Sequence, residues 1–123
     1  MTNTINASIA TFIIVNSAGW FADPAMGDGT CDDMPERERF EAHGIIAAVA
    51  GIVACGGTRD GNKARVRALT EDLHVGWHMP ARSVYDAAAR FLLWARGLED
   101  DHGAEVVDEI ADLVRFAGRH VGV

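Results

Sequence analysis

Two histidines four residues apart form the pair whose spacing could support metal chemistry. His74 and His78 stand in the stretch LHVGWHM, and on a helix two imidazoles at i and i+4 can share one zinc ion. Gly76 lies between them and Pro80 follows, which favours a turn. No acidic residue two or three positions away completes a zinc motif. We therefore expect ordinary surface or capping histidines and no metal site.

Nucleophilic catalysis has no sequence signature in this chain. Cys55 stands at the end of an apolar segment, where cysteine is usually a small core residue. Ser8, Ser17 and Ser83 lack the G-x-S-x-G context of a serine nucleophile. A phosphate-binding Walker loop and a G-x-G-x-x-G turn are also missing. The sequence predicts a protein that is not an enzyme and needs no cofactor.

An acidic loop at residues 22–33, ADPAMGDGTCDD, has part of the composition of a calcium site. An EF-hand loop would need glycine where Asp33 stands and glutamate where Arg39 stands. Both positions fail, so we interpret this segment as a solvated acidic loop.

Acidic residues recur along residues 101–120 with the spacing of one helix face. Hydrophobic residues occupy the opposite face, so we expect the acids to be exposed and unnecessary for folding. A solvated face is the ordinary interpretation. The functional interpretation is a row of carboxylates that imitates phosphates and binds a basic cleft. Internal pairing with Arg65, Arg67 or Arg90 is the competing explanation. The candidate partner-binding residues are Asp101, Glu105, Asp108, Glu109 and Asp112.

Charge is segregated along the chain. Residues 1–58 contain seven acids and two bases, residues 59–98 four acids and seven bases, and residues 99–123 seven acids and two bases. The net charge of −7 argues against broad binding to nucleic acid and favours a protein partner with a basic surface. The sequence also leaves a homodimer open.

Location is inferred from absent signals. Two isolated cysteines fit a reducing compartment and leave one disulfide open. The first 15 residues lack a basic region and a cleavage site typical of a signal peptide. The apolar run at 45–55 is too short to span a bilayer. We expect a cytoplasmic protein without a membrane partner.

Hydrophobic spacing predicts five helices. Ile5, Ile9, Phe12, Ile13 and Trp20 can share one face of a helix over about 5–20, with a strand as the alternative for this segment. Further helices are predicted at about 34–55, 60–74, 80–97 and 101–120. Their apolar faces are expected to contain Val66, Leu69 and Leu73; Val84, Ala88, Phe91, Leu92 and Ala95; and Val106, Val107, Ile110, Leu113, Val114 and Ala117.

The helix at 34–55 is predicted to be central and the most buried. Asp33 and Glu36, on either side of Pro35, predict a capping box at the start of this helix. Gly56 and Gly57 predict its C-terminal end. Glycines at 44 and 51 cost about 1 kcal/mol each relative to alanine. That cost is explained if another helix packs closely there, so Gly51→Leu should overpack the core.

A second set of observations comes from residues 45–75. An Ala-rich helix ends at Gly56, a short polar turn follows, and a charged helix carries Arg67, Glu71 and hydrophobic residues spaced like Val66, Leu69, Leu73 and Val75. This pattern resembles the helix–turn–helix core of the tellurite-resistance TerB family. The resemblance implies an all-α fold and an accessory role in a stress or defence pathway.

The metal chemistry of that family does not transfer with the pattern. Its turn is typically Asp-Gly followed by acids tied to metal binding. Here Arg59 and Gly61 stand where acidic or turn residues are expected, and only Asp60 remains. The resemblance therefore supplies no metal ligand.

The basic segment 60–96 suggests a DNA-binding alternative. LTEDLHV followed by PARSVYDAAARF could form a helix-turn-helix, with Arg82, Ser83, Tyr85 and Arg90 on the second helix. The connection HVGWHM is longer than the usual turn, which favours two ordinary packed helices.

Together these patterns predict an all-α single domain, with an N-terminal helix and acidic loop at 1–33 and a helical core at 34–123. The predicted function is non-catalytic binding of another macromolecule. The protein would be either a TerB-like stress or defence accessory module or an acidic inhibitor of a nucleic-acid-binding machine, of the anti-restriction or anti-CRISPR type. The alternative is a helix-turn-helix regulator using residues 60–96.

Overall fold

Five α-helices make up the part of the chain that the structure describes. The computed structural model describes residues 2–23, 34–76 and 82–120, and no strand occurs in these ranges. The prediction of an all-α fold is confirmed, and residues 5–20 are helix rather than strand. The helices are α1 (Thr2–Ala22), α2 (Glu36–Ala54), α3 (Arg59–Gly76), α4 (Arg82–Arg96) and α5 (Asp101–His120).

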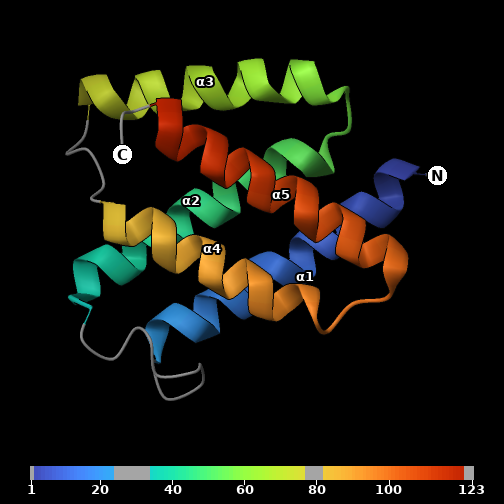
Figure 1. Cartoon of the computed structure of the whole chain (residues 1–123), viewed down its shortest axis with the longest axis horizontal. Coiled ribbons are helices and arrows are strands. Elements are labelled where there is room, and N and C mark those ends of the chain that lie inside the picture. The colour runs from blue at the N-terminus through green and yellow to red at the C-terminus, as the bar shows by residue number, and fades with distance from the viewer. Residues whose placement is uncertain (1, 24–33, 77–81, 121–123) are drawn as a thin grey trace.

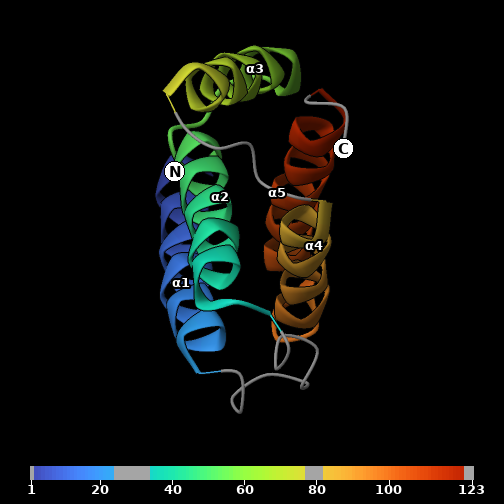
Figure 2. The same cartoon turned by 90° about the vertical axis from the view of Figure 1, so that its left-hand side faces the viewer.

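The helices form two layers, with α3 lying across one end. α1 and α2 run antiparallel in one layer, and α4 and α5 run antiparallel in the other (Figure 1, Figure 2). α3 contacts α2 in the first layer and α5 in the second. The short connection between α4 and α5, residues 97–100, favours antiparallel neighbours, whereas α1 and α2 pair across the longer connection at residues 23–35. Each layer is formed by helices that are consecutive in the chain.

The core lies between the two layers. Its largest fully buried side chains come from four helices: Ile13 of α1, Ile46 of α2, Phe91 and Leu92 of α4, and Ile110 of α5. Burying each such side chain contributes about 1.5–3 kcal/mol to stability. These residues join both layers into one hydrophobic cluster.

Aromatic rings join the end of α1 to α4. Trp20 lies 5.5 Å from Phe91 and 4.8 Å from Trp94, measured between ring centroids. Phe21 lies 5.9 Å from Phe91. The tilted and edge-on geometries are those that aromatic pairs prefer.

The apolar faces predicted for α4 and α5 are confirmed. All residues expected inside these two helices are buried: Val84, Ala88, Phe91, Leu92, Ala95, Val106, Val107, Ile110, Leu113, Val114 and Ala117. On α3, Val66 is buried, while Lys63, Arg65 and Arg67 are exposed. Leu73 lies outside the residues whose side chains are described.

The apolar face predicted for α1 is wrong at Phe12. The buried face runs through Ala10, Ile13, Ser17, Trp20 and Phe21, whereas Phe12 is exposed. At about 100° per residue, Phe12 lies about 130° from the middle of that face. Because α1 is apolar on all sides, its hydrophobic residues alone do not define which side faces the core.

α2 is central, as predicted, but it is not the most buried helix. It contacts all four other helices. Six of its 19 residues are buried, compared with seven of the 15 in α4. The reason is that one side of α2 forms part of the outer surface of its layer.

The close packing predicted at Gly44 and Gly51 is also wrong. A Cβ atom built at either glycine would meet nothing within 4 Å. By contrast, a Cβ built at Gly118 of α5 would lie 3.4 Å from the ring of Tyr85 on α4. α2 packs against α1 and the second layer through its other faces, so the two glycines point away from the core.

The two ends of α2 differ in how well they follow the prediction. The N-cap is Pro35, with ψ of 145° and no side-chain capping bond, so Glu36 begins the helix instead of closing a capping box. Asp33 lies outside the described residues. At the other end the helix stops where predicted, because Gly56 and Gly57 have φ of 82° and 97°, a conformation that favours glycine.

Candidate functional site

A serine and a histidine lie within hydrogen-bond distance between α1 and α2. Ser17 Oγ is 2.8 Å from His43 Nδ1, although the residues are 26 positions apart in sequence. Ser17 is fully buried, so its hydroxyl has no route to a substrate. Burial lowers the pKa of His43, which keeps the imidazole neutral. The pair resembles a nucleophile with its base, but its burial makes it a link between two helices.

Several residues considered for metal chemistry cannot be placed. The acidic loop at 24–33, with Cys31, and His78 lie outside the described residues, as does the side chain of His74. Within the described ranges, no three His, Cys, Asp or Glu residues are grouped so that they could hold a metal ion. Cys55 is exposed and is not in a disulfide.

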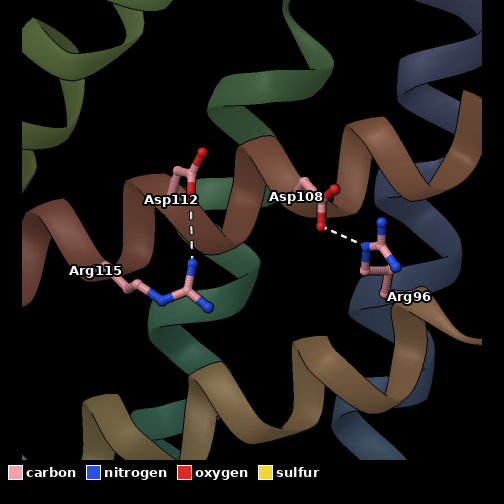
Figure 3. A network of polar contacts seen from close by, with 4 residues as sticks. All are labelled: Arg96, Asp108, Asp112 and Arg115. Atoms are coloured by element: carbon pink, nitrogen blue, oxygen red, sulfur yellow. Dashed lines mark hydrogen bonds and ion pairs between the residues drawn. The ribbon is translucent and has the colours of Figure 1, made fainter.

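The acidic stripe of α5 divides into two halves. Asp101 and Glu105, in the first half, are exposed, and no other described side chain pairs with either. In the second half, Arg96 Nε of α4 lies 2.7 Å from Asp108 Oδ1, and Arg115 Nη1 lies 3.2 Å from Asp112 Oδ1 (Figure 3). Among the contacts of the described residues, those of the second half would be lost if a partner bound these acids, whereas Asp101 and Glu105 have none to lose.

The fifth acid of the stripe, Glu109, anchors α3. The buried Asn62 donates from Nδ2 to Glu109 Oε1 over 3.2 Å and accepts at Oδ1 from Arg65 Nη1 over 2.9 Å. Glu109 is only partly exposed. A buried amide that loses its partner carries a desolvation cost of about 1–3 kcal/mol.

The expectation that all five acids are exposed is therefore wrong at Asp108 and Glu109, which are partly exposed, whereas Asp101, Glu105 and Asp112 are exposed. That the acids are unnecessary for folding stays a prediction. Among the described residues, the internal partners are Asn62 for Glu109, Arg96 for Asp108 and Arg115 for Asp112. Only the Asp112–Arg115 pair follows from i, i+3 spacing. The other two contacts depend on how α3 and α4 pack against α5.

Two exposed leucines lie near the turn between α4 and α5, close in sequence to Asp101 and Glu105. Leu93 in the last turn of α4 is 70% exposed and Leu98 in the connection is 54% exposed. Asp100 caps α5 by accepting from Gly103 N over 2.8 Å, which holds the following acids at the start of the helix. We call this surface the acidic corner; it consists of Leu93, Leu98, Glu99, Asp100, Asp101 and Glu105.

The acidic corner was not predicted from the sequence as one surface. Two features of the sequence nevertheless indicate parts of it. Leu93 falls outside the buried face that runs through Val84, Ala88 and Phe91, so its spacing alone marks it as exposed. The run from Glu99 to Glu105 has four acids and no Lys or Arg.

A cleft of about 250 Å³ lies between α3 and α5. Arg59 and Lys63 line its α3 wall, and Arg115 and Arg119 are among the residues of its α5 wall. Glu109 and Asp112 also line it, and both already contact neighbouring side chains. These acids partly neutralise the cleft, which disfavours a long polyanion such as nucleic acid.

The helix pair suggested for DNA binding is absent from the described residues. α3 and α4 make no contact with each other there; α3 packs on α2 and α5, and α4 packs on α1, α2 and α5. Tyr85, expected on a recognition surface, is buried in the core. Arg82, Ser83 and Arg90 are not core residues, but they lack the supporting helix that the motif requires.

None of the five helices has both the length and the hydropathy that a bilayer crossing needs, over the described residues. Comparison with protein-family models, with curated proteins and with solved structures found no match to this chain. The resemblance to the TerB family thus stays a prediction.

Proposed function

We propose that this chain is a non-catalytic binding protein that docks on a protein partner with a basic surface through the acidic corner. The observation that carries the proposal is the division of the α5 stripe. Asp101 and Glu105 are exposed and unpaired among the described side chains, whereas the other three acids hold neighbouring residues.

The composition of the acidic corner supports a protein partner. Protein interfaces combine a few apolar anchors with a polar rim, and charge on that rim mainly speeds association. Leu93 and Leu98 provide exposed apolar groups, and Glu99, Asp100, Asp101 and Glu105 provide the charge. A complementary partner would present Lys or Arg around a shallow apolar pocket.

Two biological settings fit this docking step. We favour an inhibitor of a nucleic-acid-binding machine, of the anti-restriction or anti-CRISPR type, because the basic clefts of such machines offer the cations that the acidic corner matches. A TerB-like accessory module in a stress or defence pathway would use the same surface on a different partner. A DNA-binding regulator is less well supported, because α3 and α4 do not form the required pair.

The test is a charge reversal with a matched control. Tagged wild-type protein is used to isolate partners from the native host, and association rates with each purified partner are then measured. Asp101→Lys/Glu105→Lys should slow association at least tenfold and reduce its dependence on salt. The control, Asp60→Lys/Asp86→Lys, changes two exposed acids outside the acidic corner and has the same net charge.

Equal slowing of association by both double variants would show that only total charge matters, and would contradict docking at the acidic corner. A partner whose association changes with neither variant would place the binding surface elsewhere.

A further inference from the structure

The outer surface of the first layer carries no charged residue beyond the first two turns of α2. α1 contains no Asp, Glu, Lys, Arg or His over its 21 residues. In α2 the charged residues all precede Ala42, and the remainder of the helix has His43 as its single titratable residue. An exposed helix face normally carries charged and polar residues, so this surface is unusual for a bundle of this size.

Large apolar side chains are exposed on these two helices. Val15 of α1 is 64% exposed and Phe40 of α2 is 76% exposed, and Phe12 is exposed as well. Both helices bury the sides that contact the core and the second layer, so their exposed positions lie on the uncovered side (Figure 2). We call this surface the apolar face; it consists of the exposed Thr11, Phe12, Val15, Ala18, Phe40 and Gly44 and the partly exposed Ala47, Ala48 and Gly51.

The apolar face is also free of covering structure among the described residues. Open space lies above Gly44 and Gly51, where a Cβ would have no neighbour within 4 Å. The sequence pattern indicated that a helix packs on these glycines, and no described helix of the same chain does so. A helix from another molecule could approach here without meeting side chains from α2.

The size of the apolar face is sufficient for a small dimer. At 1.5 Å per residue α1 is about 31 Å long, and two adjacent helices are about 20 Å wide. This gives about 600 Å² on each copy, or about 1,200 Å² in total, which is at the lower end of stable interfaces.

The distribution of charge indicates which molecule covers the apolar face. A chain of net charge −7 repels another copy of itself over most of its surface. Contact through the apolar face brings together the surfaces with the fewest like charges, and a two-fold axis matches each copy with the same uncharged surface. We propose that the apolar face is the interface of a homodimer. This interface is separate from the acidic corner, so the dimer would leave both corners exposed.

The experiment is sedimentation velocity on the whole chain over a range of concentrations. Wild type is expected to shift from the 13.2 kDa monomer toward twice that mass in the micromolar range. Val15→Glu and Val15→Lys should each weaken the dimer at least tenfold, because each places two charges in a symmetric apolar interface. Val15 is exposed in the monomer, so the folding of both variants, followed by circular dichroism, should be unchanged.

The two charge signs separate an interface from a general effect. If Val15→Glu weakens the dimer and Val15→Lys strengthens it, net repulsion is responsible and the proposed interface is wrong. Leu93→Glu/Leu98→Glu serves as the control, because it charges exposed apolar residues of the acidic corner and should leave the dimer intact. Loss of the dimer in this control would move the interface to the acidic corner.

Two further results would overturn the proposal. One is a wild-type chain that stays monomeric at several hundred micromolar. The other is a monomer that binds neutral phosphatidylcholine vesicles through Val15, which would make a lipid surface the occupant. Neither result depends on whether the acidic corner binds a protein, so the two proposals can fail separately.

Discussion

α1 and α5 are similar in length, yet α1 has no charged residue and α5 has seven among its 20 residues. In the α4/α5 layer, acids of α5 hold Arg96 at the end of α4 and Asn62 of α3. In the α1/α2 layer, the described residues make the Ser17–His43 hydrogen bond and the bonds from Arg39 to carbonyls at the end of α1. Charge therefore connects the elements of one layer, while apolar packing dominates the other.

The comparison shows how segregation along the chain becomes segregation in space. Each layer consists of helices that are consecutive in sequence, so a change of composition along the chain appears as a difference between two faces. The acids of residues 1–58 are an exception, because they are not spread over the α1/α2 layer. They begin at Asp23, after α1, and end at Glu41 near the start of α2, so most of the layer has none.

The largest difference is expected within α5 itself. Glu109→Ala should destabilise the protein by about 1–3 kcal/mol, because Asn62 is left buried without that partner. Glu105→Ala, on the exposed half of the stripe, should change stability by no more than about 0.5 kcal/mol. Chemical denaturation of both variants measures the difference, and equal stabilities would show that the stripe is not divided.

A smaller effect of opposite sign is expected on the apolar face. Gly51→Ala should stabilise the monomer by about 0.5–1 kcal/mol, because alanine is the better helix former and its Cβ meets nothing within 4 Å. The measurement is thermal denaturation in the Val15→Glu background, where self-association does not contribute. Destabilisation would mean that this side of α2 is packed, as the sequence pattern first indicated.

His43, the single histidine of the α1/α2 layer, predicts that the stability of the fold depends modestly on pH. Burial lowers the pKa of His43 below its usual 6.5, so the unfolded chain takes up this proton at a higher pH than the folded one. The stability contributed by the neutral form is therefore present above about pH 6.5 and declines as the pH falls through that value toward the lowered pKa.

His43→Gln should make the melting temperature less sensitive to pH between 7.5 and 5. His102→Gln, which changes an exposed histidine of α5, should leave the wild-type dependence in place. If the two variants lose the same amount of pH dependence, the partly buried imidazole of His43 is not its source.

Much of the fold follows from residue spacing. α4 and α5 have charged and apolar residues on opposite sides, so one face of each helix was predictable and every predicted core position on them is buried. Gly56 and Gly57 end α2 because the positive φ of this turn favours glycine at both positions. α1 was harder, because a helix without charge does not indicate which side faces water, and Phe12 was misplaced for that reason.

The sequence by itself determined the number of helices, their approximate ends and the inner faces of the amphipathic ones, because these depend on residues a few positions apart. Tertiary structure decided which charged side chains are paired within the protein and which are exposed to a partner. Arg96 and Asp108 are 12 residues apart, Ser17 and His43 are 26 apart, and Asn62 and Glu109 are 47 apart. It also decided that Gly44 and Gly51 face open space. Contacts between helices depend on how whole elements pack, and local spacing does not contain that information.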